Sequence, residues 1–197
     1  MITITAFKWV VPFAQGQVRD LRLRWLLKEV GWDYQVDLID PDIQQSEAYM
    51  AEQPFGQVPV LREPGRVTLF ETGAILLDVA ERSGRLLPED ATDRALVTCW
   101  LFGALNSIEP FLQNLAIASH FIEDQRVAEG YRAFNIENAR KRLGQTADAL
   151  GGRDWIVGDA FSIADLMLSS VTKLVEGTGL VEAHPNLAAW RDRCFSR

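Results

Sequence analysis

The chain has 197 residues, of which 48% are hydrophobic and 24% charged, the balance of a globular protein that buries a core. Asp and Glu number 27 against 20 Lys and Arg, which gives a formal net charge of −7. This sign argues against a nucleic-acid binder, which carries a basic surface. The only cysteines, Cys99 and Cys194, are far apart in sequence and favour the reduced thiols of a cytoplasmic protein.

The sequence carries no pattern of a metal site, a membrane span or a signal peptide. His120 and His184 have no neighbouring Cys or His at ligand spacing, so no metal is predicted. No apolar run approaches the roughly 18 residues of a membrane span. The start, M-I-T-I-T-A-F-K-W, lacks the basic segment and long apolar core of a signal peptide. We therefore expect no membrane partner.

Short strands alternate with helices in the first part of the chain. Residues 2–6 alternate Ile and Ala with Thr, which predicts a strand. Residues 18–30 are helical in pattern, with Gly31 as the C-terminal cap. Residues 34–39 predict a second strand.

A hairpin and a further helix follow. Residues 58–61 and 67–70 predict two more strands, and E-P-G-R at 63–66 contains a Pro-Gly pair typical of a turn. A helix is predicted over 72–82. The order strand–helix–strand–short helix–strand–strand–helix is that of a thioredoxin-like domain, which we place at residues 1–84.

The rest of the chain, residues 90–197, is predicted to be entirely helical. After the polar linker L-L-P-E-D-A-T-D at 86–93, one face of an amphipathic helix is marked by Val97, Leu101, Leu105 and Ile108. Pro110 must kink or interrupt this helix, because it lacks an amide donor. Another long helix covers residues 127–150. The predicted architecture is a small α/β domain followed by an all-α, helical-bundle domain.

Val58-Pro59 stands at the head of a predicted strand, although proline cannot donate to a sheet ladder. It is either an edge-strand proline or a cis X-Pro bond. A cis bond after a turn would make Val58 present both its N–H and its C=O outward, as an unpaired mini-strand. Such a mini-strand is suited to bind a peptide in an extended conformation.

Glu71-Thr72 lies where the last predicted strand of this half meets a helix. The free amides and partial positive charge of a helix start attract a carboxylate. Thr72 can add its hydroxyl and Glu71 can pair with an ammonium group, so the two match a ligand that carries a carboxylate and an amine on one carbon. The alternative is ordinary helix capping, which threonine often provides.

Both features occur in order within two short segments, F-G-Q-V-P-V-L at 55–61 and L-F-E-T-G-A-I at 69–75. This combination resembles the glutathione-binding domain of cytosolic glutathione transferases, with Thr72 in place of the usual serine. The resemblance covers nearly the whole chain. It implies that glutathione is the co-substrate.

The resemblance also assigns the parts of the tripeptide. It implies that Val58, followed by a cis Pro59, bonds the cysteinyl part through its backbone. Glu71 and Thr72 would hold the γ-glutamyl part, and Gln57 would lie near the glycyl end or the same backbone.

A second match, F-S-I-A-D-L at 161–166, has the pattern of a helix N-terminal box. Ser162 is placed as the cap and Asp165 three positions on, with Phe161 and Leu166 as a hydrophobic staple. The resemblance implies that this is the structural box of the family's helical domain. Its expected role is in folding.

Transferases of this family activate the glutathione thiol with a Tyr, Ser or Cys near the end of the first strand. Residues 8–19 of this chain contain none of these. Aligning R-W-L-L at 24–27 with the animal alpha-class enzymes puts Phe13 about where their tyrosine lies, and Arg19 on their assisting arginine. Activation would then need other donors.

Lowering a thiol pKa from about 8.5 to about 6.5 needs ~2.7 kcal/mol, which one or two hydrogen bonds to the thiolate can supply. The candidate catalytic donors are Arg19, Gln17 and Gln15, together with the amides of residues 16–18. The alternative for Arg19 is a solvated helix arginine. Thr5 carries a hydroxyl too, but its place in a strand indicates a structural role.

Further candidates have two interpretations each. Asn106 either contacts glutathione or is a buried residue that pairs with the backbone groups left free by the kink at Pro110. An apolar co-substrate pocket or the core would contain the aromatic residues Trp9, Phe13 and Trp100. Cys99 is expected to be a buried, small apolar residue.

The predicted function is that of an enzyme, a glutathione transferase-like protein that presents the glutathione thiolate to an electrophilic or peroxidic, apolar small molecule. Reduction of mixed disulfides fits less well, because that branch generally uses a catalytic cysteine. The alternative is a non-catalytic glutathione- or ligand-binding protein of the same fold. A homodimer is expected, paired through the helix near 72–82 and the helix starting near Arg94.

Overall fold

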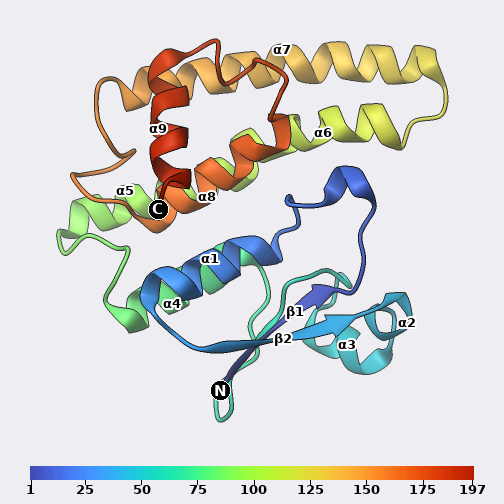
Figure 1. Ribbon diagram of the computed structural model, residues 1–197, viewed down its shortest axis with the longest axis vertical. Coiled ribbons are helices and arrows are strands. Elements are labelled where there is room, and N and C mark those ends of the chain that lie inside the picture. Colours follow the sequence, from blue (N-terminus) through green and yellow to red (C-terminus); the bar gives the residue numbers. More distant parts are fainter. The chain divides into compact units, whose positions relative to one another are not determined.

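Strand β1 (Ile2–Phe7) is the middle strand of a three-stranded sheet in the computed structural model, which describes all residues, Met1–Arg197. Strand β2 (Tyr34–Ile39) runs parallel to it, and β3 (Leu61–Arg62) runs antiparallel on its other side (Figure 1). Ile4 is fully buried, as the alternating pattern predicts.

The chain divides into two compact units, Met1–Arg85 and Leu86–Arg197. The first mixes strands with helices and the second is all helical, which confirms the predicted fold class. The helices of the first unit are η1 (Pro12–Ala14), α1 (Asp20–Val30), α2 (Pro41–Gln44), α3 (Glu47–Glu52) and α4 (Thr72–Ser83).

Helices α1 and α4 lie side by side in the first unit (Figure 1). The apolar stripe of α1, including Leu23, Leu26 and Leu27, has no exposed surface. Gly31 caps this helix with φ 76, a left-handed conformation that glycine adopts without steric cost. The predicted C-terminal cap is confirmed.

The predicted hairpin is shorter than its pattern indicated. The third strand was expected at 58–61, but β3 begins only at Leu61, since Pro59 has no N–H to give to the ladder. The fourth strand, expected at 67–70, is reduced to a single bridge between Leu69 and Leu61.

Helix α8 (Ile163–Thr172) is the centre of the second unit, because every residue of it except Ser170 is buried. Helices α5 (Ala91–Gly103), α6 and α9 pack on α8. The unit also contains η2 (Ala104–Ile108), α6 (Glu109–His120), α7 (Gln125–Leu150), η3 (Lys173–Val175) and α9 (Pro185–Phe195). Figure 1 shows α6 and α7 running side by side as a hairpin.

Pro110 interrupts its helix as predicted. It lies in the first turn of α6, and the residues just before it, η2, form a π-helical turn. The wider turn follows from the missing N–H of Pro110 and from the clash of its ring with the carbonyl four residues earlier, that of Asn106.

The N-terminal box of α8 is reciprocal. Ser162 Oγ accepts a hydrogen bond from the N–H of Ala164, and Ser162 N–H donates to Asp165 Oδ2 at 3.1 Å. Asp165 Oδ1 accepts two more, at 2.8 Å each, from Ile156 N–H and Trp190 Nε1. The predicted box is confirmed, and Asp165 also ties α8 to α9.

One stretch corrects an expectation about membranes. Residues 91–120 are helical throughout, and an 18-residue window within them has a mean hydropathy of 1.3, which meets the length and composition of a membrane span. In the structure this stretch is the run α5–η2–α6, which packs against α8 of the same unit. Length and composition alone therefore do not make this stretch a membrane span.

Candidate functional site

The sheet register brings three separate segments to one end of the first unit. Thr5 of β1 lies opposite Val60, because Thr5 N–H donates to Val60 C=O at 3.0 Å. The end of β1, where residues 8–19 begin, therefore lies beside Val58. Leu61 pairs with Leu69 through two main-chain hydrogen bonds, so Val58 and Thr72 lie an equal number of residues beyond that pair, at the same end.

The Val58-Pro59 peptide bond is cis, which was one of the two interpretations of this proline. Val58 packs in a small core cluster with Ile39, Tyr49 and Val60, and Phe7 lies against this cluster. Neither the N–H nor the C=O of Val58 makes a hydrogen bond within the chain. This residue thus has an anchored side chain and an unpaired peptide backbone.

Glu71 has φ 69 and ψ 115, a conformation that residues with a side chain rarely adopt. It is exposed and precedes the first turn of α4, where no side chain caps the free amides. Thr72, the first residue of α4, is 4% exposed. A strained residue beside uncapped helix amides is the arrangement often found where a protein holds a ligand.

The remaining predicted contacts of glutathione have different surroundings. Gln57 is exposed, and its C=O accepts a hydrogen bond of 2.7 Å from the hydroxyl of Tyr49. Phe13 is half-buried in η1. Asn106 lies in the second unit and is exposed, so its alternative as a buried residue is wrong. Its relation to glutathione stays a prediction.

The loop of candidate catalytic donors is partly engaged in its own turns. The N–H of Gln17 donates to Ala14 C=O at 3.1 Å, and the Gln15 N–H to Pro12 C=O at 3.2 Å. The Gln15 side chain reaches Val10 C=O at 3.5 Å. The side chain of Gln17 and the Gly16 amide have no such partner and remain available as donors.

Helix α1 begins at Asp20, two residues later than predicted. Arg19 is its N-cap residue and is half-buried. Asp20 is 5% exposed and bonded to Arg24 at 2.8 Å. Burial raises the pKa of Asp20 above its ordinary value of 3.8, while the hydrogen bond from Arg24 lowers it. The helix start therefore already holds one carboxyl group.

The structure shows the surroundings of the Thr5 hydroxyl and of the two cysteine thiols. Thr5 is fully buried and hydrogen-bonded to Tyr49 and Val60, which confirms its structural role. Cys99 is exposed on α5, so its prediction as a buried residue is wrong. The buried thiol is Cys194, whose pKa burial raises to about 12.

The aromatic candidates differ in exposure. Trp9 follows β1 and is 70% exposed, and the adjacent Lys8 binds Asp40 at 2.7 Å. Trp100 is half-buried on α5. Trp9 is therefore not a core residue, and its role in lining a pocket for an apolar co-substrate stays a prediction.

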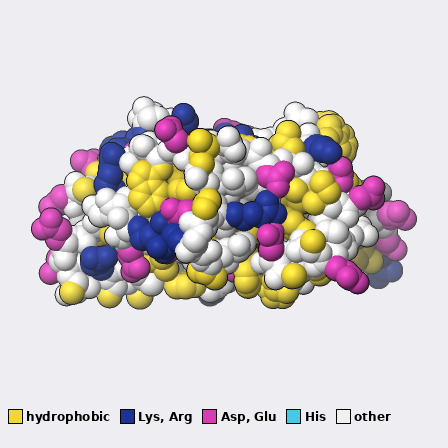
Figure 2. Space-filling view, turned by 90° about the horizontal axis from the view of Figure 1, so that it is seen from below, with side chains coloured by type: hydrophobic (Ala, Val, Ile, Leu, Met, Phe, Trp, Pro, Cys, Tyr) yellow, Lys and Arg dark blue, Asp and Glu magenta, His cyan; other side chains and the backbone are white.

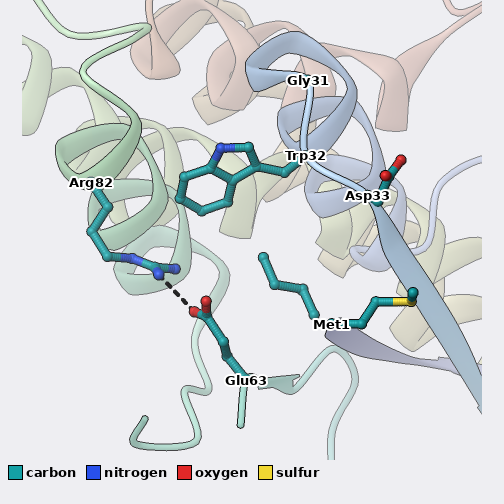
Figure 3. A pocket seen from close by; sticks show the side chains of 7 residues that line it. Met1, Gly31, Trp32, Asp33, Glu63 and Arg82 are labelled. Atoms are coloured by element: carbon teal, nitrogen blue, oxygen red, sulfur yellow. Dashed lines mark hydrogen bonds and ion pairs between the residues drawn. The ribbon is translucent and has the colours of Figure 1, made fainter. Parts of the chain in front are cut away.

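A groove of about 490 Å³ opens at the opposite end of β1, beside Met1 and Ile2. Figure 3 shows Trp32, Glu63 and Arg82 around it. The Arg82 guanidinium lies 4.9 Å from the centre of the Trp32 ring and binds Glu63 at 2.6 Å. Its charge is already neutralised, and none of the predicted site residues lines this groove.

Charges on the molecule are mixed. Figure 2 shows basic and acidic side chains interspersed on the face in view, with apolar patches between them. No group of three or more His, Cys, Asp or Glu side chains is placed to hold a metal ion.

Known proteins share both units of this chain. The model of the glutathione S-transferase N-terminal domain matches residues 13–81, and that of the C-terminal domain matches residues 114–197. The glutathione S-transferase F14 of Arabidopsis thaliana is 30% identical over 186 residues, which cover 87% of this chain and 73% of that protein. The glutathione S-transferase 1 of Zea mays is 30% identical and covers 83% of this chain and 80% of its own length.

The fold is similar to solved structures over the whole chain. A glutathione transferase from Burkholderia graminis, with two glutathione molecules bound per subunit, has a TM-score of 0.85 at 24% identity. The alignment covers 100% of this chain and 84% of that one.

Proposed function

The chain belongs to the glutathione S-transferase family, and on this basis we propose that it binds glutathione and presents the thiolate to an electrophilic or peroxidic small molecule. The observation that carries the proposal is the meeting of three segments at one end of the sheet. These are the unpaired peptide of Val58, the uncapped start of α4 with the strained Glu71, and the loop 8–19.

The proposed binding follows the chemistry of the tripeptide. The N–H and C=O of Val58 pair with the cysteinyl backbone as an added strand would. The first amides of α4 and the hydroxyl of Thr72 receive the γ-glutamyl carboxylate, since a helix start favours an anion. The Glu71 carboxylate pairs with the neighbouring ammonium. Gln57 completes the site near the glycyl end, with Phe13 as a further contact.

The thiol is proposed to be activated without a hydroxyl. Arg19 supplies a positive charge, and the Gln17 side chain and the Gly16 amide supply hydrogen bonds to the thiolate, with Gln15 as a further donor. Hydrogen bonds to a charged group contribute roughly 1.5–3 kcal/mol each, so one or two of them suffice to lower the thiol pKa by about two units.

The second substrate is proposed to be apolar. The exposed indole of Trp9 lies at the start of the same loop and offers a flat apolar surface to an electrophile. The free thiols of the chain agree with a cytoplasmic location, and a role in detoxification would follow from the reaction.

A homodimer is part of the proposal. Helix α5, which starts at Ala91, carries the exposed apolar residues Leu96 and Phe102, with Cys99 between them on the same side. An unpartnered apolar stripe of this kind favours a closed two-fold contact. A disulfide-reducing activity is not proposed, because the loop 8–19 contains no cysteine.

Calorimetric titration with glutathione tests the proposal. We expect binding, and we expect the Thr72→Val and Glu71→Gln variants to bind more weakly while their thermal unfolding hardly changes. Unchanged affinity in both variants would contradict the assigned site. The alternative, a binding protein without catalysis, predicts the same affinities but an ordinary pKa for the bound thiol.

A further inference from the structure

A chain of buried hydrogen bonds lies directly behind the Val58-Pro59 peptide. Thr5 is fully buried and Tyr49 is 2% exposed. The N–H of Val60 lies 2.8 Å from Thr5 Oγ1, which lies 3.0 Å from the Tyr49 hydroxyl oxygen, and this oxygen lies 2.7 Å from the C=O of Gln57.

The two ends of this chain decide the direction of each bond. The Val60 N–H can only donate and the Gln57 C=O can only accept. Tyr49 has one proton and gives it to Gln57, so it must accept from the hydroxyl of Thr5. Thr5 then accepts from Val60, and every group in the chain is satisfied in a single arrangement.

The chain holds the residues on both sides of the cis bond. Gln57 precedes Val58 and is fixed by Tyr49 of α3, while Val60 follows Pro59 and is fixed by Thr5 of β1. The Thr5 hydroxyl replaces the main-chain acceptor that the sheet ladder does not offer here. Both peptides that flank Val58-Pro59 are therefore anchored to rigid elements.

We propose that Tyr49 and Thr5 are positioning residues for glutathione, which fix the direction in which the unpaired N–H and C=O of Val58 point. The inference rests on the proposed function, because it names the residues that prepare the backbone for the cysteinyl part. Neither side chain touches the ligand. Both act through the peptides of Gln57 and Val60. Because these peptides are already fixed, the Val58 backbone loses less conformational entropy when glutathione binds.

The surroundings keep the Tyr49 proton in place. Burial raises the pKa of Tyr49 above its ordinary value of 10.0, while the hydrogen bond from Thr5 lowers it. Three charged groups act on this hydroxyl, and of these Arg62 forms ion pairs with both Glu52 and Asp37, at 2.7 Å each. The hydroxyl therefore stays a donor to Gln57 throughout the neutral pH range.

Two variants test the proposal in the full chain. Tyr49→Phe removes only the hydroxyl, and Thr5→Val removes the second link without changing the shape of the side chain. We expect each to raise the Kd for glutathione about fivefold to tenfold, the effect of roughly one lost buried hydrogen bond. Thr5→Ser keeps the hydroxyl and should restore the affinity.

Thr172→Val is the matched control. Thr172 is 1% exposed and donates to Ser169 C=O at 2.7 Å in the second unit, so its loss costs a buried hydroxyl of the same kind. We expect lower stability in this variant with an unchanged Kd. A parallel loss of affinity in Thr172→Val would show that general destabilisation, rather than positioning, explains the effect.

A modified ligand separates positioning from indirect damage. An ester analogue of glutathione, with oxygen in place of the cysteinyl N–H, cannot donate to the C=O of Val58. We expect Tyr49→Phe to weaken binding of glutathione more than binding of this ester analogue. An equal loss for both ligands, or no loss for glutathione, would overturn the inference.

The outcomes also separate this inference from the proposed function. Failure of the unmodified protein to bind glutathione would refute the proposed function. Binding by the unmodified protein with the same Kd in Tyr49→Phe would refute only the positioning role. If Tyr49→Phe does not fold, the comparison of Thr5→Val with Thr5→Ser decides, and equal Kd values in that pair refute the inference.

Discussion

Replacing Glu71 with glycine should make the protein more stable and its binding of glutathione weaker. Glu71 has φ 69 and ψ 115 at the start of α4, a conformation that costs a residue with a side chain free energy. Glycine adopts positive φ without this cost. If the structure keeps Glu71 in this conformation for its carboxylate, stability and affinity must change in opposite directions.

The magnitude follows from two opposing contributions. Strain of this kind costs about 1–3 kcal/mol, and the extra freedom of glycine in the unfolded chain costs about 0.5–1 kcal/mol. The net gain in Glu71→Gly is therefore up to about 2 kcal/mol, and each kcal/mol raises the Tm by roughly 2–4 °C in a chain of this size. Because Glu71 is exposed, the loss of its ion pair should raise the Kd only about twofold to fivefold.

Thermal unfolding without ligand and calorimetry with glutathione measure the two effects. Leu86→Gly is the control, since Leu86 is the other residue with a side chain and a positive φ, at 64. Its substitution removes similar strain away from the site, so glutathione affinity should not change. A fall in stability in Glu71→Gly, or an unchanged Kd, would refute the reasoning about functional strain.

Four further predictions concern other parts of the molecule. Phe102→Glu should convert a homodimer into a monomer near 22 kDa, because it places a charge in the apolar stripe of α5; light scattering checks this, and a monomeric unmodified protein would contradict the proposed dimer. Asp165→Ala should lower the free energy of unfolding by about 3–5 kcal/mol, because it leaves buried donors without a partner; a denaturant titration showing less than about 1 kcal/mol would be inconsistent with this. The hydrogen bond from Lys8 holds the pKa of Asp40 below its ordinary value of 3.8. This pair therefore stabilises the fold above pH 3.8, and the stabilisation is lost as the pH falls through the lower folded-state pKa. The stability difference between the unmodified protein and Lys8→Met should shrink in that acid range, and a constant difference would contradict the assignment. Arg19→Met should raise the pKa of the bound glutathione thiol by about one unit, roughly 1.4 kcal/mol, with nearly unchanged affinity, and an unaltered pKa would exclude Arg19 as the activating group.

Features that depend on local pattern could be predicted from the sequence. The helix ending at Gly31 and the box at Ser162 are set by neighbours in the chain, and both were found as predicted. The interruption before Pro110 follows from the chemistry of one residue. The two strands of the hairpin were predicted too long. Pro59 has no N–H to donate, so the predicted strand 58–61 pairs only from Leu61, and its partner is reduced to the bridge at Leu69.

Features that depend on contacts between distant residues could not be predicted. Tyr49 lies 44 residues from Thr5 in sequence, and nothing in its local pattern indicates that the two hydroxyls meet. The positive φ of Glu71 could not be predicted from the sequence either, since glutamate is not a residue that favours this conformation. Exposure of Cys99 was mispredicted, because an amphipathic pattern does not reveal which apolar residues a helix leaves uncovered.

The pKa of the glutathione thiol in the complex tests the central claim most directly. Ultraviolet absorbance of the thiolate, followed against pH with saturating glutathione, measures it without a second substrate. We predict a value near 6.5, about two units below that of the free thiol, because Arg19 and the donors of the loop 8–19 stabilise the anion. A bound thiol that titrates at the free value of about 8.5 would contradict the claim that this protein activates glutathione.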